Sequence, residues 1–113
     1  MVLREELSEG IVAITLNRPE SLNALSPALF SELNQIVTEL SKQTDSVGCV
    51  ILRGAGRCFS AGNDLKAVRS GVKAKEKFFQ AKTIDLIEKL PQPTIASVHG
   101  HCLTGALELA LAC

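Results

Sequence analysis

Two glycine loops, each between a strand-like run and a helix-like run, constrain the fold of this chain more than any other feature. The first loop, residues 58–66 (CFSAGNDLK), follows the apolar run Cys49–Arg53, and the second, residues 99–105 (HGHCLTG), follows Thr94–Val98. Short apolar runs are typical of strands covered on both faces, and strands that alternate with helices form parallel sheets with right-handed crossovers. We therefore expect an α/β fold with both loops beyond the carboxyl ends of parallel strands, where such sheets bind ligands.

The rest of the pattern predicts a hairpin and further helices. Val2–Leu7 and Ile11–Leu16 flank a glycine turn, which is typical of a β-hairpin. Apolar residues recur at helical spacing over Pro27–Ser41, and Ser26 before Pro27 is a favourable helix start. The other predicted helices are a short one capped by Asp64 and running to Val68, one over Ala74–Leu90 with Phe78, Phe79, Ile84, Ile87 and Leu90 as packing residues, and one beginning at Gly105.

The composition favours a small domain that binds neither nucleic acid nor a membrane interior. The 113 residues are 46% hydrophobic, enough for a packed core, and twelve basic residues balance twelve acidic ones. A neutral chain without Trp or Tyr is a poor nucleic-acid binder, and no apolar run is long enough to span a bilayer. The N-terminus does not resemble a signal peptide and the four cysteines form no CxxC pair. We therefore expect a cytoplasmic or organellar-matrix protein with reduced thiols and no metal site.

The end of the sequence is not typical of the end of a domain. Residues 1–113 contain no internal repeat or linker, so we assign them to a single domain. The chain stops at Cys113 inside an apolar helical pattern, without the glycine that commonly ends a helix. We therefore expect residues 1–113 to be the N-terminal part of a longer protein.

A basic stretch follows the first loop. Between residues 66 and 82, six basic residues accompany one acid, Glu76. Such a local excess is able to attract a phosphate-bearing ligand, although we interpret most of it as a solvated helix face. The basic residues are Lys66, Arg69, Lys73, Lys75, Lys77 and Lys82.

The two loops suggest a specific chemistry. If the backbone N–H groups of Asn63 and Gly105 converge, they form a two-donor oxyanion hole for a carbonyl that gains negative charge. Glu108 lies one helical turn after Gly105, and its carboxylate can move a proton next to that carbonyl. From the residues alone, Glu108 is equally well explained as an acid that stabilises the start of a helix.

Two other kinds of site receive less support. A dinucleotide-binding loop is disfavoured, because Phe59 stands where the fingerprint that begins with Gly54 and Gly56 requires its third glycine. His99 and His101 flank a glycine, but no third metal ligand accompanies them, so we interpret them as loop residues.

Three motifs resemble those of the crotonase (enoyl-CoA hydratase/isomerase) superfamily, in the same order and context. They are NRP with NAL in residues 17–25, FSAGNDL in residues 59–65, and Gly100 with TGALELA in residues 104–110. The resemblance covers essentially the whole chain and implies a crotonase-like ββα spiral core, truncated before the C-terminal helices. It also implies an acyl-CoA enzyme whose backbone N–H groups hold a thioester enolate. Coenzyme A would carry the substrate, and no cofactor would be permanently bound.

The resemblance assigns roles to individual residues. By motif position, Asn63 and Gly105 supply the oxyanion donors, and Glu108 matches the first of the two catalytic glutamates of the hydratases. The second glutamate lies beyond Cys113, so the resemblance implies that residues 1–113 alone are inactive and that the parent protein is a homotrimer or hexamer. The residues implied to contact the CoA thioester are Ala61, Asn63, Asp64, Leu65, Lys66 and Gly105, of which Lys66 matches a contact to the CoA phosphates and Asp64 also suits a helix N-cap.

The predicted function is the addition of water to an enoyl-CoA or its loss, as in enoyl-CoA hydratases. Two alternatives stay open: an isomerase or other acyl-CoA enzyme of the same fold, and an inactive fragment that binds CoA or a nucleotide. Glu108 favours the hydratase, since many isomerases lack an acid there. The AGND sequence of residues 61–64, however, also occurs among isomerase-like members of the superfamily.

Overall fold

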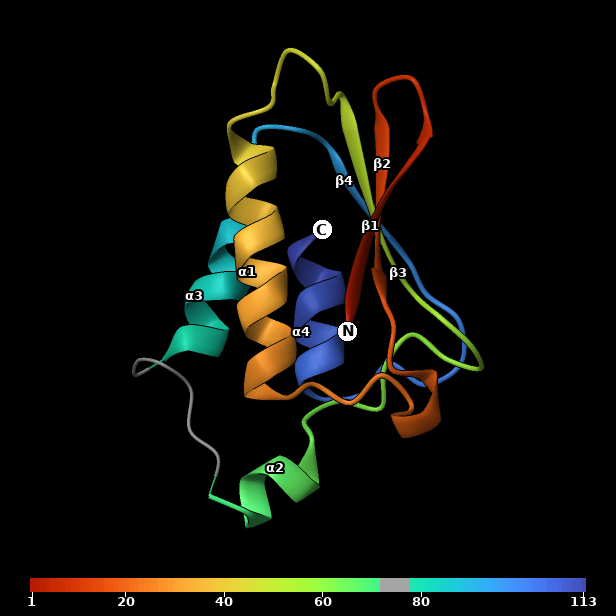
Figure 1. The fold of residues 1–113 in the computed structure, drawn as a ribbon, viewed down its shortest axis with the longest axis vertical. Helices are drawn as coiled ribbons and strands as arrows, with labels where there is room; N and C mark the ends of the chain where they lie inside the picture. Colours follow the sequence, from red (N-terminus) through yellow and green to blue (C-terminus); the bar gives the residue numbers. More distant parts are fainter. Residues whose placement is uncertain (72–77) are drawn as a thin grey trace.

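Four strands form one sheet, and three helices pack against one of its faces (Figure 1). The computed structural model describes residues 1–71 and 78–113. The strands are β1 (Val2–Ser8), β2 (Ile11–Leu16), β3 (Cys49–Gly54) and β4 (Thr94–Ser97). The helices are the 3-10 turn η1 (Pro19–Ser21), α1 (Pro27–Ser41), α2 (Leu65–Arg69), α3 (Phe79–Glu88) and α4 (Gly105–Ala112).

The sheet has the mixed topology expected of an α/β fold. Its strand order is β1-β2-β3-β4, with β1 antiparallel to β2 and the other two pairs parallel. Val50 pairs with Thr94 and Arg53 with Ser97, so the two apolar runs are parallel neighbours, as predicted. Both glycine loops therefore leave the sheet at the same edge, beyond the carboxyl ends of β3 and β4.

The burial of the two central runs corrects one expectation. Val50 and Leu52 are 2% and 3% exposed, but Cys49, Ile51 and Arg53, which alternate with them, are only half-buried. No residue of β4 is buried, and Ile95 is 52% exposed. The prediction that both runs are covered on both faces is therefore wrong. The physical reason is that the described helices pack on one face only, so each strand buries alternate side chains at most.

The first long helix follows its sequence pattern. Ser26 caps α1 by accepting a hydrogen bond from Leu29 N at 3.1 Å, and Pro27 occupies the first helical position. Its buried face packs over the sheet and against α3 and α4, forming the hydrophobic core. The buried residues of α1 are Leu29, Phe30, Leu33, Val37 and Leu40, and those that α3 and α4 add to the core are Ile87, Ala106 and Leu109.

The second long helix is shorter than predicted. Phe78 has a left-handed backbone (φ 62°) and is 69% exposed, so α3 begins after it rather than at Ala74, and α3 ends at Glu88 before Leu90. Residues 74–77 of the predicted helix lie outside the described residues, as do Lys73, Lys75, Glu76 and Lys77 of the basic stretch. Among the described residues, no helix is long and apolar enough to cross a membrane.

Candidate functional site

The two glycine loops run side by side. Phe59 N donates to His99 O at 2.7 Å and Ser60 N to His101 O at 3.0 Å. Leu103 N returns a hydrogen bond to Ser60 O at 3.3 Å. This short parallel pairing extends the register of β3 and β4 beyond the sheet and carries both loops to one place.

The two loops approach each other closely at Gly62. Its φ of +97° is unfavourable for any other residue. A Cβ there would lie 2.7 Å from Leu103 O and would collide with the Thr104 side chain. A glycine is therefore required at this position by both conformation and space.

Asn23 holds the first loop from the opposite side. Its side chain is fully buried, and Oδ1 accepts a hydrogen bond from Arg18 N at 2.8 Å. Its Nδ2 group donates to the carbonyls of Ala55, Cys58 and Phe59 at 2.8, 3.0 and 3.1 Å. The NAL motif thus orders the loop that carries Asn63.

Replacing Asn23 by Ala is expected to destabilise the protein by about 3 kcal/mol or more, because buried polar groups lose their partners. Denaturant unfolding of the complete protein measures the loss. Asn23→Gly is the matched variant: it also removes the amide but relieves the left-handed backbone (φ 54°), so it should destabilise slightly less. Wild-type stability in both variants would contradict this role.

Asn63 and Gly105 lie against each other at the meeting point of the loops. A Cβ on Gly105 would lie 2.7 Å from Asn63 Oδ1, so only glycine lets the Asn63 side chain approach this closely. Gly105 is the first residue of α4, and the Thr104 before it has a left-handed φ of 47°. Within residues 1–71 and 78–113, neither the N–H of Asn63 nor that of Gly105 donates a hydrogen bond. Two backbone donors are therefore available beside a helix start.

Asp64 has a structural role. Its Oδ1 accepts hydrogen bonds from the backbone of Lys66 and Ala67, at 3.0 and 3.2 Å, and Oδ2 pairs with Arg18 Nη1 at 3.1 Å. The Ala67 N–H and then the Arg18 guanidinium hold the pKa of the Asp64 carboxyl below its usual range. The ionised form therefore stabilises the fold at neutral pH, and that contribution is lost as the pH falls through the lowered pKa. The predicted N-cap role of Asp64 is confirmed.

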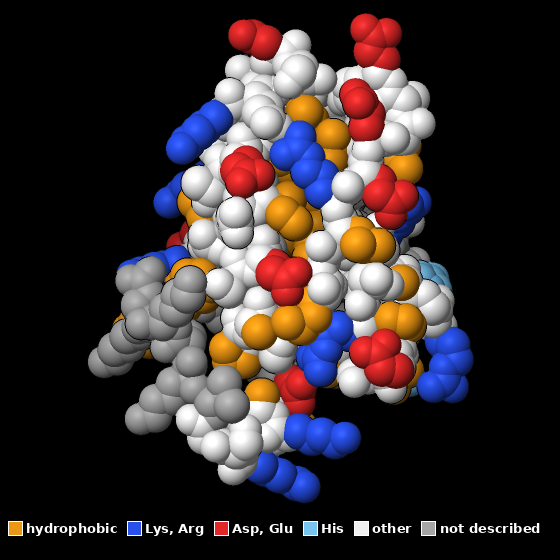
Figure 2. Space-filling model, viewed as in Figure 1, with side chains coloured by type: hydrophobic (Ala, Val, Ile, Leu, Met, Phe, Trp, Pro, Cys, Tyr) orange, Lys and Arg blue, Asp and Glu red, His pale blue; other side chains and the backbone are white. Residues whose placement is uncertain are grey.

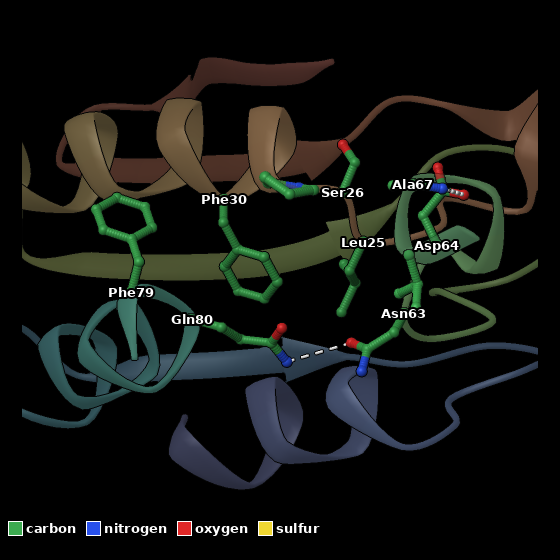
Figure 3. Close-up of a pocket in the computed structure, with 10 residues that line it drawn as sticks. Leu25, Ser26, Phe30, Asn63, Asp64, Ala67, Phe79 and Gln80 are labelled. Atoms are coloured by element: carbon green, nitrogen blue, oxygen red, sulfur yellow. Dashed lines mark hydrogen bonds between the residues drawn. The ribbon is translucent and has the colours of Figure 1, made fainter. Parts of the chain in front are cut away.

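A cavity of about 120 Å³ opens beside Asn63, between α1, α2 and α3 (Figure 3). Its walls are mostly apolar, and the amides of Asn63 and Gln80 meet at its edge. A half-enclosed apolar space with few polar groups is typical of small-molecule sites. The residues that line it are Leu25, Ser26, Pro27, Phe30, Asn63, Asp64, Ala67, Val68, Phe79 and Gln80.

The other predicted site residues do not line this cavity. Glu108 is exposed in the first turn of α4, on the same helix as Leu107 and Leu111, which are 47% and 75% exposed. Lys66 and Leu65 are exposed on α2, and basic side chains project at the end of the molecule that α2 forms (Figure 2). Ala61 is half-buried and donates its N–H to Leu22 O at 2.9 Å. Among the described residues, no three His, Cys, Asp or Glu side chains group as a metal site requires.

Sequence reasoning missed the contribution of α3. Gln80 reaches Asn63 across seventeen residues, and Phe79 lines the same cavity. Helical spacing identified Phe79 as a packing residue, but nothing in the pattern indicates that the first turn of α3 faces the first loop.

Comparisons with known proteins agree on one family. The family described as Enoyl-CoA hydratase/isomerase matches residues 6–113. YngF of Bacillus subtilis, named for the same family, is 42% identical over 113 residues, covering 94% of this chain and 42% of YngF. The crystal structure of an enoyl-CoA hydratase from Bacillus anthracis superposes with a TM-score of 0.88 at 38% identity, covering 99% of this chain and 45% of that one. A monofunctional enoyl-CoA isomerase from M. smegmatis superposes at 0.81 and 35% identity, with 99% and 46% covered. This chain thus spans less than half the length of these relatives.

Proposed function

The chain belongs to the enoyl-CoA hydratase/isomerase family, and from that premise we propose that the complete protein is an acyl-CoA enzyme of the hydratase type. Its substrate would be an enoyl thioester of coenzyme A, to which it adds water, or the product, from which it removes water. Coenzyme A enters as the carrier of the substrate, and the proposal requires no resident cofactor.

One observation carries the proposal. The N–H groups of Asn63 and Gly105 donate no hydrogen bond within residues 1–71 and 78–113, and they lie in loops that pack together beside a mostly apolar cavity. A thioester oxygen that accepts from both becomes more negative as the enolate forms, and fixed donors stabilise that charge most in the transition state. The start of α4 adds its positive dipole end at the same point. The cavity next to Asn63 offers space for the acyl chain.

Glu108 is proposed as the acid–base group. In hydration, a carboxylate accepts a proton from the attacking water as the new C–O bond forms at C3, and the enolate is then protonated at C2. The position of Glu108, one turn after Gly105, supports this role, and its exposed carboxylate is free of hydrogen bonds within the described residues.

The second candidate is an enoyl-CoA isomerase, which would use the same donors to hold a dienolate. The 35% identity to a monofunctional enoyl-CoA isomerase supports this second candidate. A homotrimer or hexamer is part of the proposal and can be checked by sedimentation of the complete protein.

Two thioesters distinguish the candidates. The complete protein is expected to abolish the conjugated-enoyl absorbance of crotonyl-CoA by hydration. An isomerase would instead create that absorbance from a 3-enoyl-CoA. Turnover of neither thioester, by a folded protein, would overturn the proposed function.

The phosphates of CoA are proposed to contact Lys66. Replacing Lys66 by Ala is expected to raise the dissociation constant for acyl-CoA severalfold at low salt and to flatten its salt dependence, because exposed charge pairs are screened. Titration across a salt series measures both effects. Lys42→Ala, at the far end of α1, is the matched control and should change neither. Identical binding by Lys66→Ala and wild type at every salt concentration would refute the contact.

A further inference from the structure

The cavity beside Asn63 has mostly apolar walls, and two side-chain amides contact each other at its edge. Gln80 Nε2, in the first turn of α3, donates to Asn63 Oδ1 at 3.2 Å, and this amide pair lies over the start of α4 (Figure 3). We propose that the Asn63–Gln80 pair determines substrate specificity. It selects acyl thioesters with a hydroxyl or carbonyl oxygen a few carbons beyond the thioester over plain hydrocarbon chains. This inference rests on the proposed acyl-CoA function.

The position of the pair supports this role. A Cβ built on Gly105 would lie 2.7 Å from Asn63 Oδ1 and 2.8 Å from Gln80 Nε2. An acyl group whose carbonyl oxygen accepts from Gly105 N–H would therefore lie close to the amide pair. In this proposal the pair would contact the chain near the thioester, and the apolar walls would surround the remainder of the chain. Those walls are formed by Leu25, Pro27, Phe30, Ala67, Val68 and Phe79.

The amide pair also has polar groups that its mutual hydrogen bond does not use. Each side chain carries one NH₂ group and one oxygen. Their mutual hydrogen bond uses the NH₂ group of Gln80 and the oxygen of Asn63. Among residues 1–71 and 78–113, Asn63 Nδ2 and Gln80 Oε1 have no other partner. Exchanging O and N in both amides leaves the same groups, so the pair offers one NH₂ group and one oxygen in either orientation.

An acyl chain that covers the amide pair makes these polar groups selective for an oxygen on the chain. Asn63 is exposed and Gln80 half-buried, so water solvates both amides in the free protein. A hydrocarbon chain that displaces this water leaves a donor and an acceptor unpaired, whereas an oxygen on the chain replaces the water. An acyl chain that covers these polar groups is therefore disfavoured when it lacks the matching oxygen.

Two saturated thioesters test the proposal in the complete protein. 4-Hydroxybutyryl-CoA and pentanoyl-CoA differ only in a terminal hydroxyl against a methyl group, and neither undergoes hydration, so calorimetric titration reports binding alone. We expect the wild type to bind 4-hydroxybutyryl-CoA about tenfold more tightly. Gln80→Leu should remove most of that preference while binding free CoA as the wild type does. Gln35→Leu, an exposed position on α1, is the matched control and should keep it.

The possible results separate this inference from the proposed function. Equal binding of the two thioesters by the wild type, or an unchanged preference in a folded Gln80→Leu variant, would overturn the specificity role alone. Failure of the wild type to bind either thioester would overturn the acyl-CoA function and this inference with it. A second variant, Gln80→Glu, keeps an acceptor but cannot donate to Asn63 Oδ1. It should weaken the preference without abolishing it, and complete retention would count against the pair acting as a unit.

Discussion

Crotonyl-CoA hydration by the complete protein is expected to fall by about two orders of magnitude or more when Glu108 is replaced by Gln. Glutamine keeps the shape of the side chain but cannot accept and return a proton. The loss should appear in kcat, with the dissociation constant for the thioester nearly unchanged. The measurement is the disappearance of the conjugated-enoyl absorbance under saturating and subsaturating substrate.

The control for Glu108 tests the simpler interpretation that this acidic residue only stabilises the N-terminus of the helix. In that role its replacement would change stability by at most about 1 kcal/mol and leave turnover intact. Glu39→Gln, at an exposed position late in α1, removes an acid without touching the site and should leave both properties as in the wild type. Normal hydration by a folded Glu108→Gln variant would reject the acid–base assignment.

Removing the N–H of Gly105 is expected to reduce turnover by roughly a hundredfold or more, the typical effect of losing one oxyanion donor. Gly105→Pro deletes that donor at the first helical position, where proline fits a helix. Steady-state kinetics of the complete protein measure the loss, and circular dichroism checks the fold, since proline restricts the unusual backbone of Thr104 (φ 47°, ψ −114°).

Gly105→Ala distinguishes the effect of the N–H donor from the effect of the space that glycine leaves free. Alanine keeps the N–H but brings a Cβ within 2.7 to 2.8 Å of the ends of two flexible side chains, Asn63 and Gln80, which can shift. We therefore expect a smaller loss of turnover than with Gly105→Pro. Wild-type turnover by a folded Gly105→Pro variant would reject the donor role. A larger loss in Gly105→Ala than in Gly105→Pro would show that Gly105 acts through space rather than through its N–H.

The parallel pairing of β3 and β4 was predictable, because each strand is a short apolar run followed by a glycine loop and a helix. The meeting of Asn63 with Gly105 follows from that topology, since loops at the carboxyl ends of adjacent parallel strands share one edge. The burial of β4 was not predictable, because an apolar run does not reveal how many faces its neighbours cover. Ile95 is equally apolar whether it is exposed or covered.

The contact between Gln80 and Asn63 could not be predicted from the sequence, for a different reason. Its contact with Asn63 depends on how α3 packs against α1, and therefore on the whole arrangement of the helices. Local periodicity specifies which face of a helix is apolar, but not which loop lies opposite its first turn. The residue types also gave no signal, since glutamine is common on exposed helix surfaces.

The hydrogen bonds of Asn23 have a consequence for how the site forms during folding. They join residues 32 to 36 positions apart, so no short segment can assemble the first loop by itself. Closing so long a stretch of chain costs entropy that only the surrounding tertiary contacts return. The donor geometry at Asn63 should therefore appear late and disappear together with the packing of the hairpin and α1. Partly folded chains would keep their helices while lacking the site.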